Sequence, residues 1–114
     1  MAKVLLAEDD PTMLSLLRTL LKMEGFEVLT LNDEADVPAA VRREKPDVLL
    51  MDVRLGEQNG LEILESIRRN QDLSNVRVVM TSGLNMKDEC LGQGANAFLL
   101  KPFMPDDLLR LLKS

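Results

Sequence analysis

The sequence KVLLAEDDPTM at residues 3–13 decides the fold, because a short apolar run stands directly before three acidic residues. An unbroken run such as Val4–Ala7 is typical of a strand buried on both faces of a parallel sheet. Adjacent carboxylates repel each other, and more strongly when they are partly dehydrated. We therefore expect a positive species beside Glu8, Asp9 and Asp10 at the end of this strand.

Similar apolar runs recur along the chain and alternate with segments of helical spacing. The predicted strands are 4–7, 28–31, 48–51, 76–80 and 97–100. The predicted helices are 11–25, 34–45, 59–70, a short one within 85–94, and 105–114. Five such alternations predict an α/β, doubly wound fold, in which right-handed crossovers build a parallel sheet covered by helices on both sides.

The composition indicates one soluble domain that spans residues 1–114. The chain is 46% hydrophobic and 29% charged, which is ordinary for a globular protein. Its net charge of -5 argues against a nucleic-acid surface, and the densest basic run, 41–45, is too short to form one. No apolar stretch is long enough to predict a membrane span or a signal peptide.

Cysteine and histidine content excludes several kinds of site. The single cysteine, Cys90, cannot form an internal disulfide, and a chain without histidine lacks the usual ligands of zinc and the base of a Ser-His-Asp triad. We interpret Cys90 as a packing residue and expect a cytoplasmic location, where thiols stay reduced.

Polar residues stand at the carboxyl ends of the predicted strands, where ligands bind in an open parallel sheet. Asp52 ends the third strand, Thr81 and Ser82 follow the fourth, and Lys101 and Pro102 follow the fifth. We expect them to converge with the acids after the first strand on one pocket.

The residue types at these strand ends favour magnesium and phosphoryl chemistry. Mg²⁺ prefers carboxylate and water oxygens, so Asp9 and Asp52 could bind it directly and Glu8 through water. An aspartate carboxylate can also attack phosphorus and form an acyl phosphate. The metal, the Ser82 hydroxyl and the Lys101 ammonium could then each take one phosphoryl oxygen.

Four motifs, LLAEDDP, VLLMDVRLGEQNG, TSG and FLLKPF, resemble in this order the response-regulator receiver domains of two-component signalling, the CheY-like family. The resemblance covers essentially the whole chain. It implies a flavodoxin-like (βα)5 fold with strand order 2-1-3-4-5. It also implies that Asp52 accepts a phosphoryl group from a histidine kinase or histidine phosphotransfer protein, with Mg²⁺ or Mn²⁺ as cofactor, and that phosphorylation changes the surface offered to an output partner.

Further roles follow from the same resemblance, residue by residue. Glu8 and Asp9 match the acidic pair, and the backbone carbonyl of Arg54 matches the remaining protein ligand of the metal. Lys101 matches the lysine of the Lys-Pro-Phe signature, in which the Lys-Pro peptide is typically cis. Phe98 matches the rotating aromatic position.

The switch hydroxyl is assigned to Ser82, because the family pattern places a small residue, here Gly83, directly after it. Thr81 remains the alternative.

Met13, Leu14 and Pro102 are predicted to contact a partner, because receiver domains dock the phosphodonor histidine domain beside this site. We expect at least one of Met13 and Leu14 to lie off the buried face of the first helix, although an exposed apolar residue there can also be incidental. Asp10 precedes Pro11 and is expected to cap that helix.

Several positions depart from the family pattern. Gly56 replaces a frequent proline, which predicts a looser loop without loss of a ligand. The fourth helix is short and the last ends early, which predicts a monomer or weak dimer. Leu84, two residues beyond the switch hydroxyl, offers no polar group to orient water, which predicts a long-lived phosphoryl group.

Other function classes fit less well. A phosphohydrolase of the haloacid dehalogenase type would need an aspartate where Arg54 stands, and a flavodoxin would need a hydroxyl- and glycine-rich loop after the first strand. The domain is therefore expected to be a phosphoacceptor rather than an enzyme. A binding-only receiver that is never phosphorylated stays open, as do the cognate kinase, the output pathway and whether Ser114 is the native C-terminus.

Overall fold

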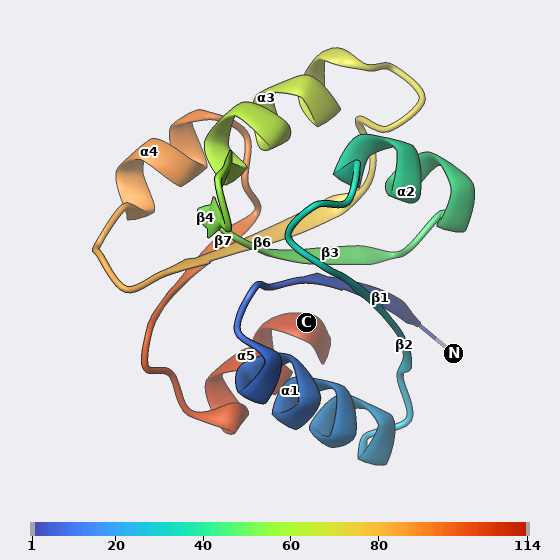
Figure 1. The fold of residues 1–114 in the computed structure, drawn as a ribbon, viewed down its shortest axis with the longest axis vertical. Coiled ribbons are helices and arrows are strands. Elements are labelled where there is room, and N and C mark those ends of the chain that lie inside the picture. The colour runs from blue at the N-terminus through green and yellow to red at the C-terminus, as the bar shows by residue number, and fades with distance from the viewer. Residues whose placement is uncertain (1, 114) are drawn as a thin grey trace.

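A five-stranded parallel sheet forms the centre of the molecule in the computed structural model, which describes residues 2–113. Its strands lie in the order β2-β1-β3-β6-β7, which confirms the predicted order 2-1-3-4-5 (Figure 1). Their bounds are β1 Lys3–Ala7, β2 Glu27–Leu31, β3 Val48–Asp52, β6 Arg77–Ser82 and β7 Ala97–Leu100.

Helices cover both faces of the sheet, as expected of a doubly wound fold (Figure 1). Helices α1 and α5 lie on one face, and α2, α3 and α4 lie on the other. Their bounds are α1 Pro11–Met23, α2 Val37–Glu44, α3 Gly60–Arg69, α4 Lys87–Gly92 and α5 Pro105–Lys113. Each face has its own hydrophobic cluster, and buried strand residues alternate between them. Ser114, at the end of the predicted last helix, lies outside the described residues.

Helix α1 starts directly beside the acidic residues that follow β1. The Asp10 carboxylate accepts hydrogen bonds from the backbone N–H groups of Thr12, at 2.9 Å, and Met13, at 3.3 Å. These bonds satisfy donors that have no partner within the helix, so the prediction that Asp10 is the N-cap is confirmed. Leu17 and Leu21 then bury the inner face of α1 against the sheet.

The fourth helix is short, as predicted, with six residues and no side-chain cap at its N-terminus. Cys90 on this helix is fully buried in the hydrophobic cluster beneath it, which confirms its interpretation as a packing residue. The strand before the helix was predicted to end at residue 80. It continues to Ser82, so that Thr81 and Ser82 are strand residues.

A small antiparallel hairpin follows β3 and was not predicted from the sequence. It pairs β4 (Arg54–Leu55) with β5 (Gln58–Asn59) across a two-residue turn. Gly56 opens the turn with φ +61°, a backbone conformation that glycine adopts freely and proline cannot. Where the sequence predicted a looser loop, the structure has a tight hairpin that requires glycine.

Candidate functional site

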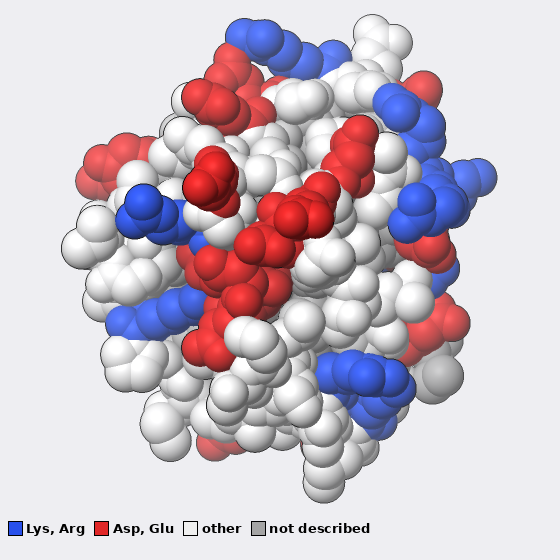
Figure 2. Space-filling model, viewed as in Figure 1, with Lys and Arg blue, Asp and Glu red and all other residues white. Residues whose placement is uncertain are grey.

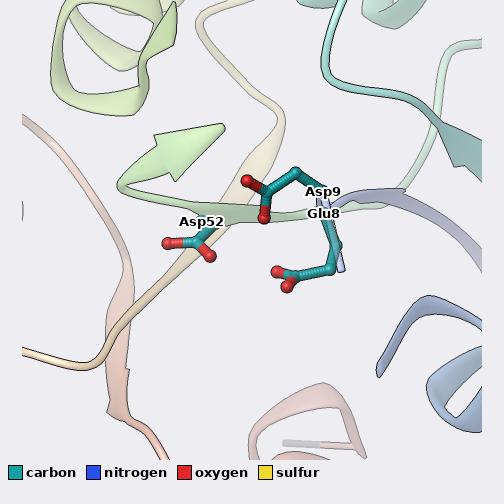
Figure 3. Close-up of side chains that lie close together, drawn as sticks. All are labelled: Glu8, Asp9 and Asp52. Carbon is teal, nitrogen blue, oxygen red and sulfur yellow. The ribbon is translucent and has the colours of Figure 1, made fainter. Parts of the chain in front are cut away.

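Three carboxylates from two neighbouring strands meet at the carboxyl edge of the sheet. Glu8 and Asp9 follow β1, and Asp52 ends β3, which pairs with β1 in parallel register. One oxygen of each carboxylate lies within 4.8 Å of the others. Figure 3 shows all three side chains directed toward a common space. The predicted convergence of Asp9 and Asp52 is therefore present.

Lys101, which follows β7, brings the expected positive charge into this cluster. Its Nζ lies 2.7 Å from Asp52 Oδ2 and 3.1 Å from both Glu8 carboxylate oxygens. The Glu8 and Asp52 residues are buried, with 6% and 8% of their surface exposed. The Lys101 ammonium thus bridges two buried carboxylates.

Burial and these contacts shift two pKa values in the cluster. Burial raises the pKa of Glu8 above its ordinary value, and the nearby charge of Asp52 adds to this, although Lys101 acts in the opposite direction. Burial by itself lowers the pKa of Lys101, but its hydrogen bonds and its attraction to Asp52 and Glu8 outweigh burial and raise the pKa. Lys101 is therefore fully charged at neutral pH.

Backbone N–H groups of the loop after β3 hold two further carboxylate oxygens of the cluster. The Arg54 N–H donates to Asp52 Oδ1 at 3.1 Å, and the Gly56 N–H donates to Asp9 Oδ2 at 3.1 Å. Arg54 and Gly56 both belong to the hairpin of β4 and β5 or its turn. The hairpin therefore helps to fix two of the three carboxylates in the cluster.

The donor set of the cluster fits a hard divalent cation. All three side chains offer carboxylate oxygens, the ligands that Mg²⁺ prefers. When all three are ionised, their three negative charges and the one positive charge of Lys101 leave a net charge of about -2, which a divalent cation would neutralise. Figure 2 shows acidic side chains gathered in a band over the loops that follow β1 and β2.

The two candidate hydroxyls after Asp52 lie in different surroundings. Ser82 lines an open groove of about 820 Å³ together with Asp9 and Asp52, and its Oγ accepts a hydrogen bond from the Leu84 N–H at 3.1 Å. Thr81 lines a separate small cavity with Asp52 and Lys101. Because both residues line the groove, the Ser82 hydroxyl could contact a chemical group bound to Asp52.

The predicted switch and docking residues lie around this site. Phe98 is half-buried against the cluster beneath α2, α3 and α4, and Pro102 is exposed directly after Lys101. The Lys101-Pro102 peptide is cis, as expected from the resemblance.

The expectation for Met13 and Leu14 is wrong in one respect. Neither side chain lies off the buried face, because both are partly buried against the hydrophobic cluster beneath α1 and α5. The exposed apolar side chain in the first half of this helix is Leu16, with 61% of its surface exposed; Met23 is exposed at the far end of the helix. Helical spacing could have identified it, because Leu16 lies outside the three- and four-residue spacing of Leu14, Leu17 and Leu21.

The sequence interpretation missed Gly60 and Gln58, which support the loop after β3. A Cβ atom on Gly60 would overlap the carbonyl oxygens of Asp52 and Val53, and the Gly60 N–H donates to Val53 O at 2.6 Å. The dipeptide Asn59-Gly60 is a turn signal, and it could have identified Gly60 from the sequence. Gln58 carries no comparable signal.

Comparisons with known proteins agree with this arrangement. The family profile described as response regulator receiver domain matches residues 4–113. The DNA-binding response regulator MtrA of Mycolicibacterium smegmatis is 31% identical over 98% of this chain, which spans 49% of that relative's own length. Protein PilH of Pseudomonas aeruginosa is 31% identical over all of this chain and 97% of its own.

Solved structures show the same fold. The chemotaxis response regulator CheY4 of Vibrio cholerae has a TM-score of 0.88 at 27% identity, with 99% of this chain and 97% of that chain covered. The receiver domain of sensor histidine kinase PA1611 from Pseudomonas aeruginosa has a TM-score of 0.87 at 29% identity, with 98% and 94% covered. That structure holds a magnesium ion coordinated in its active-site cleft.

None of the helices in residues 2–113 combines the length and the apolar composition that crossing a membrane requires. The family profile spans nearly the whole chain, and the fold agrees with it. This chain belongs to the response regulator receiver domain family.

Proposed function

We propose that this domain is a phosphorylation-dependent switch in which Asp52 accepts a phosphoryl group from a histidine kinase or a histidine phosphotransfer protein. The observation that carries the proposal is the position of Asp52 Oδ2, 2.7 Å from the Lys101 ammonium and within a cluster of three carboxylates. This arrangement supports the proposal, because the Asp52 carboxylate lies beside the Lys101 ammonium and next to carboxylates that could bind a second cation. Two cations beside a carboxylate nucleophile would stabilise the charge on the phosphoryl oxygens during transfer.

In the proposed transfer, an oxygen of the Asp52 carboxylate attacks phosphorus and forms an acyl phosphate. The bond between phosphorus and the donor imidazole nitrogen breaks, the nitrogen keeps the electron pair, and it takes up a proton from solvent. Lys101 can turn from Asp52 toward a phosphoryl oxygen while it remains paired with Glu8.

Asp9, Asp52, Glu8 through water and the Arg54 carbonyl would hold the metal ion. When bound, Mg²⁺ supplies positive charge that neutralises a phosphoryl oxygen. Arg54 lines the same groove as Asp9 and Asp52, which supports its assignment.

Ser82 and Phe98 are proposed to carry the change to the surface. The Ser82 hydroxyl, which lines the groove beside Asp52, would donate a hydrogen bond to the phosphoryl group. The Leu84 N–H donates a hydrogen bond to the same hydroxyl, so a movement of Ser82 would displace the largely exposed loop at 83–86. Phe98 would then repack at the edge of the hydrophobic cluster.

The partner surface is proposed to include Met13, Leu14 and Pro102, with the exposed apolar side chain of Leu16 beside the first two on α1. PilH is similar to this chain over almost its whole length, and MtrA over about half of its own. The output partner is therefore proposed to be either a separate protein or a fused effector domain, in the cytoplasm.

Intact mass spectrometry tests the proposal directly. The protein is incubated with Mg²⁺ and a small acyl phosphate, and the wild type is expected to gain the mass of one PO₃ unit. Asp52→Asn should show no such gain. The matched control Asp72→Asn, which changes an exposed aspartate after α3, should gain the PO₃ unit as the wild type does. If the wild type gains no PO₃ unit although Mg²⁺ binds, the domain is a binding-only receiver. A gain that persists in Asp52→Asn would place the phosphoacceptor elsewhere.

Sedimentation with beryllofluoride as a phosphoryl analogue tests the oligomeric state. Helix α4 has six residues, which supports the proposal of a monomer or weak dimer. A tight dimer that depends on the analogue would contradict it.

A further inference from the structure

We propose that Gln58 is a positioning residue for the metal site. It holds the hairpin of β4 and β5 against the loop at 32–36, and through the Gly56 N–H it fixes the carboxylate of Asp9. This inference rests on the proposed function, because it concerns a ligand of the proposed Mg²⁺ site.

The first observation is the pair of hydrogen bonds made by the Gln58 side chain. Its Nε2 donates to the carbonyl oxygens of Asp33, at 2.7 Å, and Ala35, at 3.0 Å. These acceptors lie 25 and 23 residues earlier in the chain, in the loop between β2 and α2. An amide NH₂ group has two donors, so this side chain uses its full donor capacity to join two loops.

The second observation is the close fit of the hairpin turn against the same loop. A Cβ atom on Gly56 would lie 2.6 Å from the Cβ and Oδ2 of Asp33, so only a glycine fits at this point. Gln58 is paired with Leu55, the residue directly before Gly56, and Leu55 is completely buried. The turn is therefore held on one side by Leu55 and on the other by the bonds of Gln58.

The third observation links the turn to the metal site. The Gly56 N–H donates to Asp9 Oδ2 at 3.1 Å, and one oxygen of Asp9 lies within 4.8 Å of ligand oxygens from Glu8 and Asp52. Asp9 is exposed, so without this bond its side chain would sample several rotamers. The bond selects one rotamer before the metal arrives, which reduces the entropy lost on binding.

The expected effect of losing Gln58 is a weaker metal site. Residues that orient a ligand from outside its contact shell typically change metal affinity by 10- to 100-fold in buried sites. Because Asp9 is exposed and its bond comes from a backbone amide, we expect a smaller loss, about 3- to 10-fold.

Calorimetric titration of the metal-free full chain with Mg²⁺ tests this expectation without any phosphoryl donor. Gln58→Ala should raise the Mg²⁺ dissociation constant by about 3- to 10-fold. The matched control Gln71→Ala, an exposed glutamine in the loop after α3, should leave it within about twofold. An unchanged dissociation constant in Gln58→Ala would overturn the inference.

A double-mutant cycle separates positioning from general stabilisation of the fold. If Gln58 acts through Asp9, then Gln58→Ala should change Mg²⁺ affinity by less than about twofold in an Asp9→Asn background. An equal loss in both backgrounds would show that Gln58 merely stabilises the fold, and would overturn the inference.

Amide hydrogen exchange of Gly56 provides a second readout in the absence of metal. Gln58→Ala and Asp9→Asn should each speed exchange at Gly56, and Gln71→Ala should not. Unchanged exchange in Gln58→Ala would contradict the inference even if Asp9→Asn binds too little Mg²⁺ for the cycle. If the wild type itself binds no Mg²⁺, the proposed function fails. If the wild type binds Mg²⁺ and Gln58→Ala binds it with the same dissociation constant, only the present inference fails.

Discussion

Two loops border the groove in front of Asp52, and they differ in how firmly they are held. The loop after β3, residues 53–59, forms a hairpin whose N–H groups bond to Asp9 and Asp52 and whose Gln58 side chain bonds to the loop after β2. The loop after β6, residues 83–86, has three exposed residues of four and leads into a helix that lacks a side-chain cap. Its side-chain hydrogen bonds are short-range: the Leu84 N–H donates to Ser82 Oγ at the end of β6, and the Lys87 N–H donates to Asn85 Oδ1.

This difference matches the two tasks that the proposed function assigns to the site. If Asp9 and Asp52 hold a metal as proposed, they must keep their geometry, and the bonds that tie the loop after β3 to distant segments would serve that task. A switching loop must reach a second position at a small cost in free energy, so few bonds should connect it to the rest of the protein. The predictions below test whether the two loops differ in this way.

The largest effect is expected for Gly60→Ala at the first residue of α3, directly after the loop at 53–59. The new Cβ would overlap the carbonyl oxygens of Asp52 and Val53, so the backbone must move. We expect a loss of about 3 kcal/mol or more in the free energy of unfolding, measured by urea titration. Gly92→Ala is the control, because no atom lies within 4 Å of its Cβ position. A loss below about 1 kcal/mol in Gly60→Ala would show that this loop adapts easily.

A smaller effect is expected for Lys101→Met. The variant leaves the buried carboxylates of Glu8 and Asp52 without their cation, which should destabilise the metal-free protein by about 2 kcal/mol at neutral pH. Added Mg²⁺ should then raise the thermal midpoint of the variant by more than that of the wild type, because the metal replaces the missing charge. A variant as stable as the wild type without metal would show that the bridge by Lys101 contributes nothing.

The deficit of Lys101→Met should also depend on pH. The pKa of Glu8 is raised in the wild type although Lys101 lowers it, so removal of Lys101 should raise it further. A carboxyl whose pKa is higher in the folded state binds its proton more tightly there, so protonation favours the folded state as the pH falls. The deficit should therefore shrink as the pH falls through the Glu8 pKa of the folded variant. A deficit that grows over this range would contradict the assignment.

The strands could be located from the sequence because their signals are local and strong, although the fourth was predicted to end two residues too early. Apolar runs placed the five strands, and the rule that ligands bind at carboxyl ends placed Glu8, Asp52 and Lys101 together. The Asp10 cap also followed from its position before Pro11. In each case the position could be predicted from the residue type and one neighbouring helix or strand.

The hairpin after β3 could not be predicted, because its cause lies outside its own sequence. Gly56 was interpreted as a source of looseness, whereas its positive φ and its contact with Asp33 make it part of a tight turn. The bonds from Gln58 to the loop after β2 join residues more than 20 positions apart, and no local pattern predicts such a pair. Partial burial of Met13 likewise depends on how α1 packs beside α5.

A change of rate rather than stability is expected for Leu84→Asn in the loop after β6. Leu84 lines the groove beside Asp52 and is 73% exposed, so the substitution should leave the free energy of unfolding within about 0.5 kcal/mol. If Asp52 is phosphorylated as proposed, an amide at this position can orient a water toward the acyl phosphate. We expect hydrolysis to become about threefold faster, measured by loss of the PO₃ mass over time. A rate equal to that of the wild type would show that Leu84 does not control access of water.

The smallest effect is expected for Gly83→Ala in the loop after β6. It is the same substitution, glycine to alanine, as Gly60→Ala. No atom lies within 4 Å of the Cβ position of Gly83, so the new methyl group meets no obstacle. Alanine also restricts the unfolded chain, which partly offsets any loss, so the free energy of unfolding should change by less than about 0.5 kcal/mol. Urea titration of both variants compares the two loops directly. If Gly83→Ala is as harmful as Gly60→Ala, residues 83–86 are held as tightly as the hairpin, and the switching role assigned to their freedom has no physical basis.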